Sequence, residues 1–211
     1  IGGLTLLGRL RIFRASDPIP MLEHTNQFEL LYLHSGRKIF FIEDQRYDMN
    51  GGDVLLIFPG EPHGADDVAQ NRTLLFYLLF QDPANTPGFL GLDEEERRAL
   101  AGRLRSLGRR SFAAPPGLRR LFDEMFIMLS GQCPIRSTRL KYLALELIWQ
   151  VIATAEKTCG SVPDDIEQAA AYIRENIKST PSVTELAKLV HLSVSRFKQK
   201  FKQSTGVPPA E

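Results

Sequence analysis

The stretch of residues 182–206, near the C-terminus, constrains the fold more than any other part of the chain. Ser182 and Glu185 have the spacing of a capping box, in which each side chain satisfies a free backbone N–H at the start of a helix. Ser193 is a suitable cap for a second helix, and Gly206 is a suitable stop. The sequence therefore predicts two short helices, joined by a tight turn just before Ser193.

The second predicted helix has an apolar side and a polar side. At 100° per residue, Val194, Phe197 and Phe201 fall within one arc and can be buried against the first helix. The polar side and its flanks carry hydroxyl, amide and cationic groups, from Ser195, Arg196, Lys198, Gln199 and Lys202. This pattern favours a helix-turn-helix that binds DNA. The alternative is an ordinary helical hairpin with a solvated basic face.

The polar side chains of this helix can be sorted by the part of DNA that each type recognises. Ser195, Lys198 and Gln199 are candidates for base edges in the major groove. Arg196 and Lys202 are candidates for the phosphate backbone, whose charge they would neutralise. The whole chain has a net charge of only +1, so any DNA-binding character has to be local to this helix.

This stretch resembles the first helix-turn-helix of the AraC-type transcription regulators. The shared pattern is E-L-A at 185–187, L-S at 192–193 and F-K-x-x-F-K-x-x-x-G at 197–206. His191 stands where family members often have glycine, and Lys200 stands where many have leucine or methionine. The resemblance implies a DNA-binding domain with a second helix-turn-helix, and we expect that second module to be missing from this chain.

Residues 1–90 have the pattern of short strands separated by turns rich in glycine and proline, which is typical of a sandwich or a small barrel. Strands are predicted at residues 4–14, 28–34, 39–42, 46–49, 53–58 and 72–80. The region resembles a cupin barrel, the sensor half of AraC-type regulators, at His24, at 28–36 and at 52–63.

The candidate effector-binding residues of this barrel are His24, Glu29, Tyr32 and His63. A few convergent polar groups on an apolar wall would suit a sugar or a similar small molecule. Alternatively, Glu29 and His63 are structural polar groups at strand ends. His24, Glu29 and His63 could also hold iron, zinc or manganese. Cupin enzymes have a further histidine where Asn26 stands, and the spacing to Glu29 differs by one, so we expect no metal or other cofactor.

Residues 91–160 have the pattern of helices, at 93–110, 118–129 and 136–157. They can simply pack on the barrel. In the AraC family, helices that follow the barrel also form the dimer contact, so the resemblance implies a homodimer with 118–129 or 136–155 in its interface. A boundary is expected at residues 160–163, followed by a supporting helix that buries Ile166, Ala170, Ile173 and Ile177.

Together these predictions describe an α+β chain with a cupin-like barrel at 1–90, a dimerising helical region at 91–160 and a partial DNA-binding domain at 161–211. No catalytic motif, signal peptide or membrane-length apolar run is evident, so we expect a cytoplasmic protein that is not an enzyme. The expected function is an effector-responsive regulator of double-stranded promoter DNA, acting by a shift between two conformations. The alternatives are a metal-dependent cupin enzyme with appended helices, and an effector-binding or oligomerising module that does not bind DNA.

Overall fold

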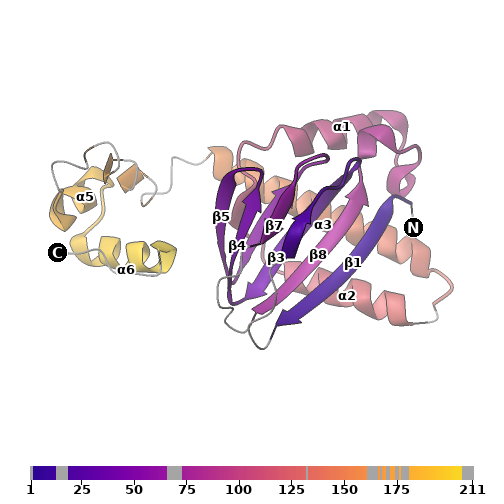
Figure 1. Cartoon of the computed structure of the whole chain (residues 1–211), viewed down its shortest axis with the longest axis horizontal. Coiled ribbons are helices and arrows are strands. Elements are labelled where there is room, and N and C mark those ends of the chain that lie inside the picture. Colours follow the sequence, from indigo (N-terminus) through magenta and orange to yellow (C-terminus); the bar gives the residue numbers. More distant parts are fainter. Residues whose placement is uncertain are drawn as a thin grey trace. The chain divides into compact units, whose positions relative to one another are not determined.

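The computed structural model describes residues 2–12, 19–65, 73–131, 133–160, 166, 168–169, 172–173, 176 and 181–205, and only the backbone of residues 158–160, 199 and 202–205. The chain divides into two compact units, Ile1–Cys159 and Gly160–Glu211 (Figure 1). Within the described residues, no helix combines the length and the apolar character needed to cross a membrane.

The first unit is built on two antiparallel sheets. The larger sheet has the order β1-β8-β3-β6-β9, with β1 at Leu4–Ile12, β8 at Thr73–Gln81, β3 at Gln27–Ser35, β6 at Asp53–Ile57 and β9 at Ser111–Ala113. The smaller sheet has the order β2-β7-β4-β5, with β2 at Ile19–Leu22, β7 at His63–Ala65, β4 at Arg37–Ile42 and β5 at Gln45–Asn50. Antiparallel sheets followed by helices confirm the predicted α+β class.

Three strands, β2, β7 and β9, lie outside the strand predictions. They contain four, three and three residues, which is too short to show an alternating pattern. β9 pairs with β6 and occupies residues expected to be part of a break between helices. The preceding helix therefore ends at Arg105 and not at Arg110.

The side chains of β3 alternate between two hydrophobic cores, because successive residues of a strand point to opposite faces. Phe28, Leu30 and Tyr32 lie in the core that the larger sheet forms with the helices. Leu31 and Leu33 lie in a second core, between the two sheets. β8 is buried on both faces in the same way, which explains its nearly continuous apolar sequence.

Three helices, α1 at Glu94–Arg105, α2 at Leu118–Ser130 and α3 at Arg136–Gly160, share a core with the larger sheet. α2 and α3 run across the outer face of this sheet, and α1 lies at the upper ends of the strands in Figure 1. Two short 3-10 helices, η1 at Pro83–Asn85 and η2 at Phe89–Gly91, precede them. Asp93 and Glu96 form a capping box at the start of α1, whose acidic first turn also suits the helix dipole. The apolar positions predicted for the longest helix are all buried in α3: Leu140, Leu143, Leu147, Ile148, Val151 and Ile152.

In the second unit, α5 spans Val183–Leu189 and α6 spans Val194–Thr205. Both halves of the predicted capping box between Ser182 and Glu185 are present. His191 has a φ of 54°, so the turn between the helices uses the left-handed conformation that glycine adopts most easily. Of the predicted supporting helix, Ile166 is buried and Ile173 packs against the same core, while Ala170 and Ile177 lie outside the described residues.

Candidate functional site

Three of the predicted effector-binding residues come together at one end of the space between the sheets. His24 lies just after β2, Glu29 lies in β3, and His63 begins β7. The carboxylate Oε2 of Glu29 is 2.9 Å from Nε2 of His63 and 3.7 Å from Nε2 of His24. The two imidazole rings are 5.3 Å apart. Residues separated in the sequence by a loop and several strands therefore form one polar cluster.

His63 is held firmly in this cluster. Its side chain is 4% exposed, and Nδ1–H donates a hydrogen bond to the carbonyl oxygen of Glu61, at 2.8 Å. Nε2 is buried and makes an ion-pair contact with Glu29, but no well-directed hydrogen bond. Burial lowers the pKa of His63, but the contacts with Glu29 and with Glu61 together outweigh it, so the pKa is raised above its usual value.

The first unit should lose stability as the pH rises through the raised pKa of His63. A histidine whose pKa is higher in the folded state than in the unfolded state stabilises the folded state. This contribution is complete below the unfolded-state pKa and disappears above the folded-state pKa. Thermal denaturation between about pH 5.5 and 8.5 would measure the trend. Glu29→Gln should flatten it, because the carboxylate that favours the imidazolium is gone. An equally steep trend in Glu29→Gln would contradict this assignment.

The polar cluster opens into a cavity of about 260 Å³ between the two sheets. Strands of both sheets contribute its walls, and most of the lining side chains are apolar. The cavity is lined by Leu6, Leu10, Ile19, Leu22, His24, Glu29, Leu31, Phe40, His63, Gly64, Leu75, Tyr77 and Leu79. The polar lining groups other than Tyr77 are the three members of the cluster. The sequence patterns did not indicate the walls contributed by β1, β2 and β8, because only strand pairing brings them together.

Tyr32 does not belong to this cavity, contrary to the sequence-based prediction. It lies an odd number of residues from Glu29 along β3, so its side chain points to the opposite face of the sheet. There it packs among the rings of Phe76 and Phe122, and its hydroxyl is 3.1 Å from Nδ1 of His34. Tyr32 is therefore part of the core under the helices.

The cluster also fits a divalent metal ion. One ligand atom from each of His24, Glu29 and His63 lies within 4.8 Å of the other two. Two imidazoles and a carboxylate are a suitable donor set for zinc, iron or manganese. Nε2 of His63, which is buried without a well-directed hydrogen bond, would be satisfied as a metal ligand. The geometry therefore keeps open the metal-binding alternative that the sequence allowed.

In the second unit, α6 presents polar groups to solvent on one side and packs Phe197 into the small core on the other. Phe197 is completely buried, and its ring is 5.6 Å from that of Phe201. Ser195 and Arg196 are exposed, and Lys198 is partly buried. Val194 is 37% exposed and lies outside the core, which corrects the prediction that it would be buried with the two phenylalanines.

The side chains of Gln199 and Lys202, also predicted to contact DNA, lie outside the described residues, although the backbone of both is helical. The backbone N–H of Arg196 donates a hydrogen bond to the hydroxyl of Ser193, at 3.3 Å. This bond supports the predicted helix cap and fixes where α6 begins.

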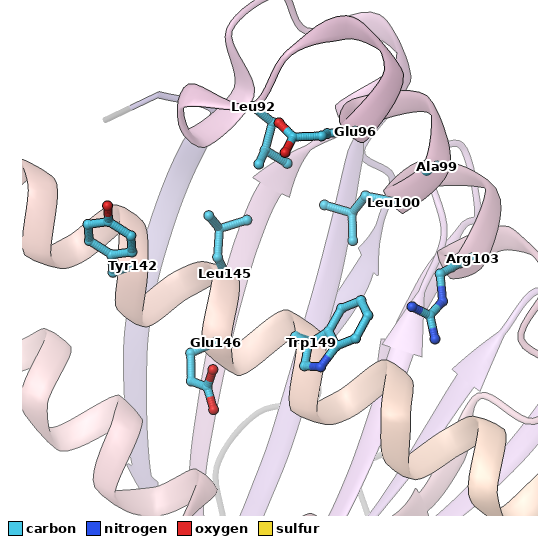
Figure 2. A pocket seen from close by; sticks show the side chains of 9 residues that line it. All are labelled: Leu92, Glu96, Ala99, Leu100, Arg103, Tyr142, Leu145, Glu146 and Trp149. Atoms are coloured by element: carbon cyan, nitrogen blue, oxygen red, sulfur yellow. The ribbon is translucent and has the colours of Figure 1, made fainter.

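A second hollow, of about 440 Å³, lies between α1 and α3 on the outside of the first unit (Figure 2). Leu100 of α1 and Leu145 and Trp149 of α3 point into it (Figure 2). Trp149 is 50% exposed, and the guanidinium of Arg103 lies 4.4 Å from the centre of its ring. We refer to this hollow as the α1–α3 groove. It was not predicted from the sequence.

Comparison with known proteins identifies similarity in the first unit. A family model described as the AraC-like ligand binding domain matches residues 20–141, which is more than half of the chain. A search of curated protein sequences finds no match.

Solved structures similar to this chain include CuxR, ToxT and a predicted decarboxylase. The AraC-like transcriptional activator CuxR is 17% identical, with 86% of this chain and 63% of the CuxR chain covered and a TM-score of 0.37. Apo ToxT from Vibrio cholerae is 10% identical, with 96% and 75% covered and a TM-score of 0.45. A predicted oxalate decarboxylase from Thermotoga maritima is 19% identical, with 37% and 68% covered and a TM-score of 0.35. The chain thus spans less than two thirds of the CuxR chain.

Proposed function

Because this chain belongs to the family that the AraC-like ligand binding domain defines, we propose that it is a transcription regulator that binds a small effector in its barrel and promoter DNA through its C-terminal unit. The observation that carries the DNA-binding part is the orientation of α6, which buries Phe197 and exposes Ser195 and Arg196. Residues 1–90 would bind the effector, 91–160 would dimerise and 161–211 would bind DNA in the cytoplasm. An effector that prefers one conformation would change how DNA is bound.

Single substitutions on α6 test the proposed division between base and phosphate contacts. Gln199→Ala should reduce discrimination at one or two base pairs, by about 1–3 kcal/mol each. Lys202→Ala should instead weaken binding to all sequences and make the salt dependence less steep, because one phosphate contact is lost. Fluorescence anisotropy with the upstream DNA of the gene and with a scrambled duplex measures both effects. Equal effects of both substitutions on the two duplexes would contradict this division of roles.

The exposed side of α3 is the surface best suited to the proposed homodimer. Tyr142 and Trp149 are seven residues apart, and Ile135 precedes them by the same interval. All three are at least half exposed, at 67% for Ile135, 64% for Tyr142 and 50% for Trp149. If two copies pair with their α3 helices antiparallel, Tyr142 of each copy meets Trp149 of the other, and the α1–α3 groove is covered. Such a contact is self-complementary, as a two-fold interface requires.

Trp149→Ser should therefore weaken the dimer by at least about tenfold, because a large aromatic side chain at the centre of an interface carries much of its binding energy. Sedimentation velocity over a concentration series would give the dimerisation constant. Ile127→Ser is a matched control, since Ile127 is 60% exposed on α2 and lies outside the proposed surface. A chain that is monomeric throughout the series, or equal weakening by both substitutions, would contradict this interface.

The metal-dependent cupin enzyme remains a second candidate, supported by the convergence of His24, Glu29 and His63 on one point. These three residues would hold the ion, which would supply Lewis-acid chemistry at the polar end of the cavity. Calorimetric titration with zinc and manganese ions, repeated on His63→Ala, tests this candidate. Tight binding that is lost in the variant would favour it. The third candidate, a module without DNA binding, predicts no affinity for any duplex.

A further inference from the structure

The cavity between the sheets offers little to a sugar. A sugar carries hydroxyl groups around its whole ring, and each hydroxyl buried without a partner costs about 1–3 kcal/mol. Leucine, isoleucine and phenylalanine side chains form most of the cavity wall. A ligand that fills this cavity therefore has to bury mainly hydrocarbon against it.

Apart from Tyr77, which lies opposite Leu31 in the wall, the polar side chains that a ligand could reach are concentrated at one end. The ligand atoms of His24, Glu29 and His63 lie within 4.8 Å of each other, and the side chain of Glu29 is only 12% exposed. One small head group can contact all three side chains, whereas polar groups farther along the ligand would face a wall whose lining side chains are apolar except for Tyr77. The volume of about 260 Å³ is also slightly below the usual range for ligand sites, which is roughly 300–1,000 Å³.

The charges of the cluster disfavour a charged head group. Oε2 of Glu29 lies 2.9 Å from Nε2 of His63, so the carboxylate already has a partner within the cluster. A carboxylate on the ligand would be placed beside the carboxylate of Glu29, and an ammonium group could pair with that carboxylate only by displacing Nε2 of His63 from it. Burying a charge without a partner is costly.

We propose that the effector is a small, mostly hydrocarbon molecule with one uncharged hydrogen-bonding head group, such as an alcohol or a phenol. The hydroxyl would lie at the Glu29–His63 pair, where it can donate to the carboxylate, and the hydrocarbon would extend along the walls formed by Leu31, Phe40 and Leu75. This inference rests on the proposed function, since it takes the cavity as the effector site.

Isothermal titration calorimetry with matched probes tests the class of ligand. Benzyl alcohol and 4-ethylphenol carry an uncharged head, benzylamine and benzoate carry charged heads, and L-arabinose represents the sugars. The two uncharged probes should bind at least about tenfold more tightly than the other three, because neither an unpaired charge nor unpaired hydroxyls are buried. Tighter binding of arabinose or of a charged probe, or binding of no probe at all, would overturn the proposal.

Two variants locate the binding. Leu75→Phe fills part of the cavity and should lower affinity for both uncharged probes at least about tenfold, whereas Leu129→Phe, at a 45% exposed position on α2, should not. Circular dichroism verifies that each variant folds. If Leu75→Phe does not fold, Glu29→Gln still tests the proposal. In that variant the affinity for benzoate should rise relative to the affinity for benzyl alcohol, because the repelling carboxylate is removed. Unchanged selectivity in Glu29→Gln would overturn the placement of the head group.

The ligand class and the regulator function can fail separately. If arabinose binds and Leu75→Phe abolishes its binding, the cavity is an effector site but the proposed class of effector is wrong. DNA binding is measured without any of these probes, so its absence contradicts the regulator and leaves the ligand class to be decided by the titrations.

Discussion

Phe197→Ala is expected to unfold the C-terminal unit while the first unit stays folded. Phe197 is completely buried at the centre of a small core, which contains Ile166, Val183, Leu186 and Val190 among others. Removing a buried phenylalanine side chain costs about 3–5 kcal/mol. A single core of this size seldom supplies more than about 3–5 kcal/mol of stability, so the substitution should consume most or all of it.

Hydrogen exchange followed by mass spectrometry separates the two units in one experiment. In Phe197→Ala, peptides from 183–205 should lose their protection, while peptides from β3 and β8 should keep it. Val194→Ala is the matched control, because Val194 lies three residues earlier on the same helix and is 37% exposed. It should cost less than about 1 kcal/mol. Retained protection of 183–205 in Phe197→Ala would show that the described core does not hold this unit together.

Lys38→Met is expected to stabilise the first unit by about 1–3 kcal/mol. Lys38 is 4% exposed in β4, and its Nζ has no hydrogen-bond partner among the described residues. Its amine lies 5.8 Å from the centre of the Phe40 ring, a contact that only partly replaces water. Methionine keeps the length of the side chain and removes the cost of burying the amine.

The pH dependence of this gain gives it a distinctive signature. Burial lowers the pKa of Lys38 from its ordinary value of 10.5, so the unfolded chain holds the proton more tightly. The destabilisation is therefore complete below the lowered pKa and shrinks as the pH rises toward 10.5. In thermal denaturation, Lys38→Met should have a higher melting temperature than the parent at neutral pH, and the two melting temperatures should become similar at alkaline pH. Lys157→Met, at an exposed position of α3, should change little. A loss of stability in Lys38→Met would show that the amine has a partner.

The features that the sequence predicted correctly depend on local signals. The capping box at Ser182 and the buried position of Phe197 follow from spacing within one helix. β2, β7 and β9 could not be found in this way. Each is too short to show an alternating pattern, and each pairs with strands that are distant in the sequence. The error at Tyr32 was avoidable, since a strand that contains both Glu29 and Tyr32 must place them on opposite faces.

The candidate site was only partly predictable for the same reason. His24, Glu29 and His63 could be named from residue type and from the resemblance to a family. Their apolar surroundings could not, because Leu6, Leu79 and the other walls reach the cavity only through the pairing of β1 with β8. Sequence alone therefore suggested a sugar, whereas the walls of the cavity suit a more apolar ligand. The burial of Lys38 likewise has no signal in its own sequence neighbourhood.

The central claim, that this protein is a DNA-binding regulator, is tested most directly by fluorescence anisotropy with the upstream DNA of its gene and a scrambled duplex across a salt series. We predict a preference for the upstream DNA that disappears when Ser195, Lys198 and Gln199 are changed to alanine together. Lys188→Ala, which removes a charge from the exposed side of α5, should retain the preference. Equal affinity for both duplexes at every salt concentration would contradict the claim.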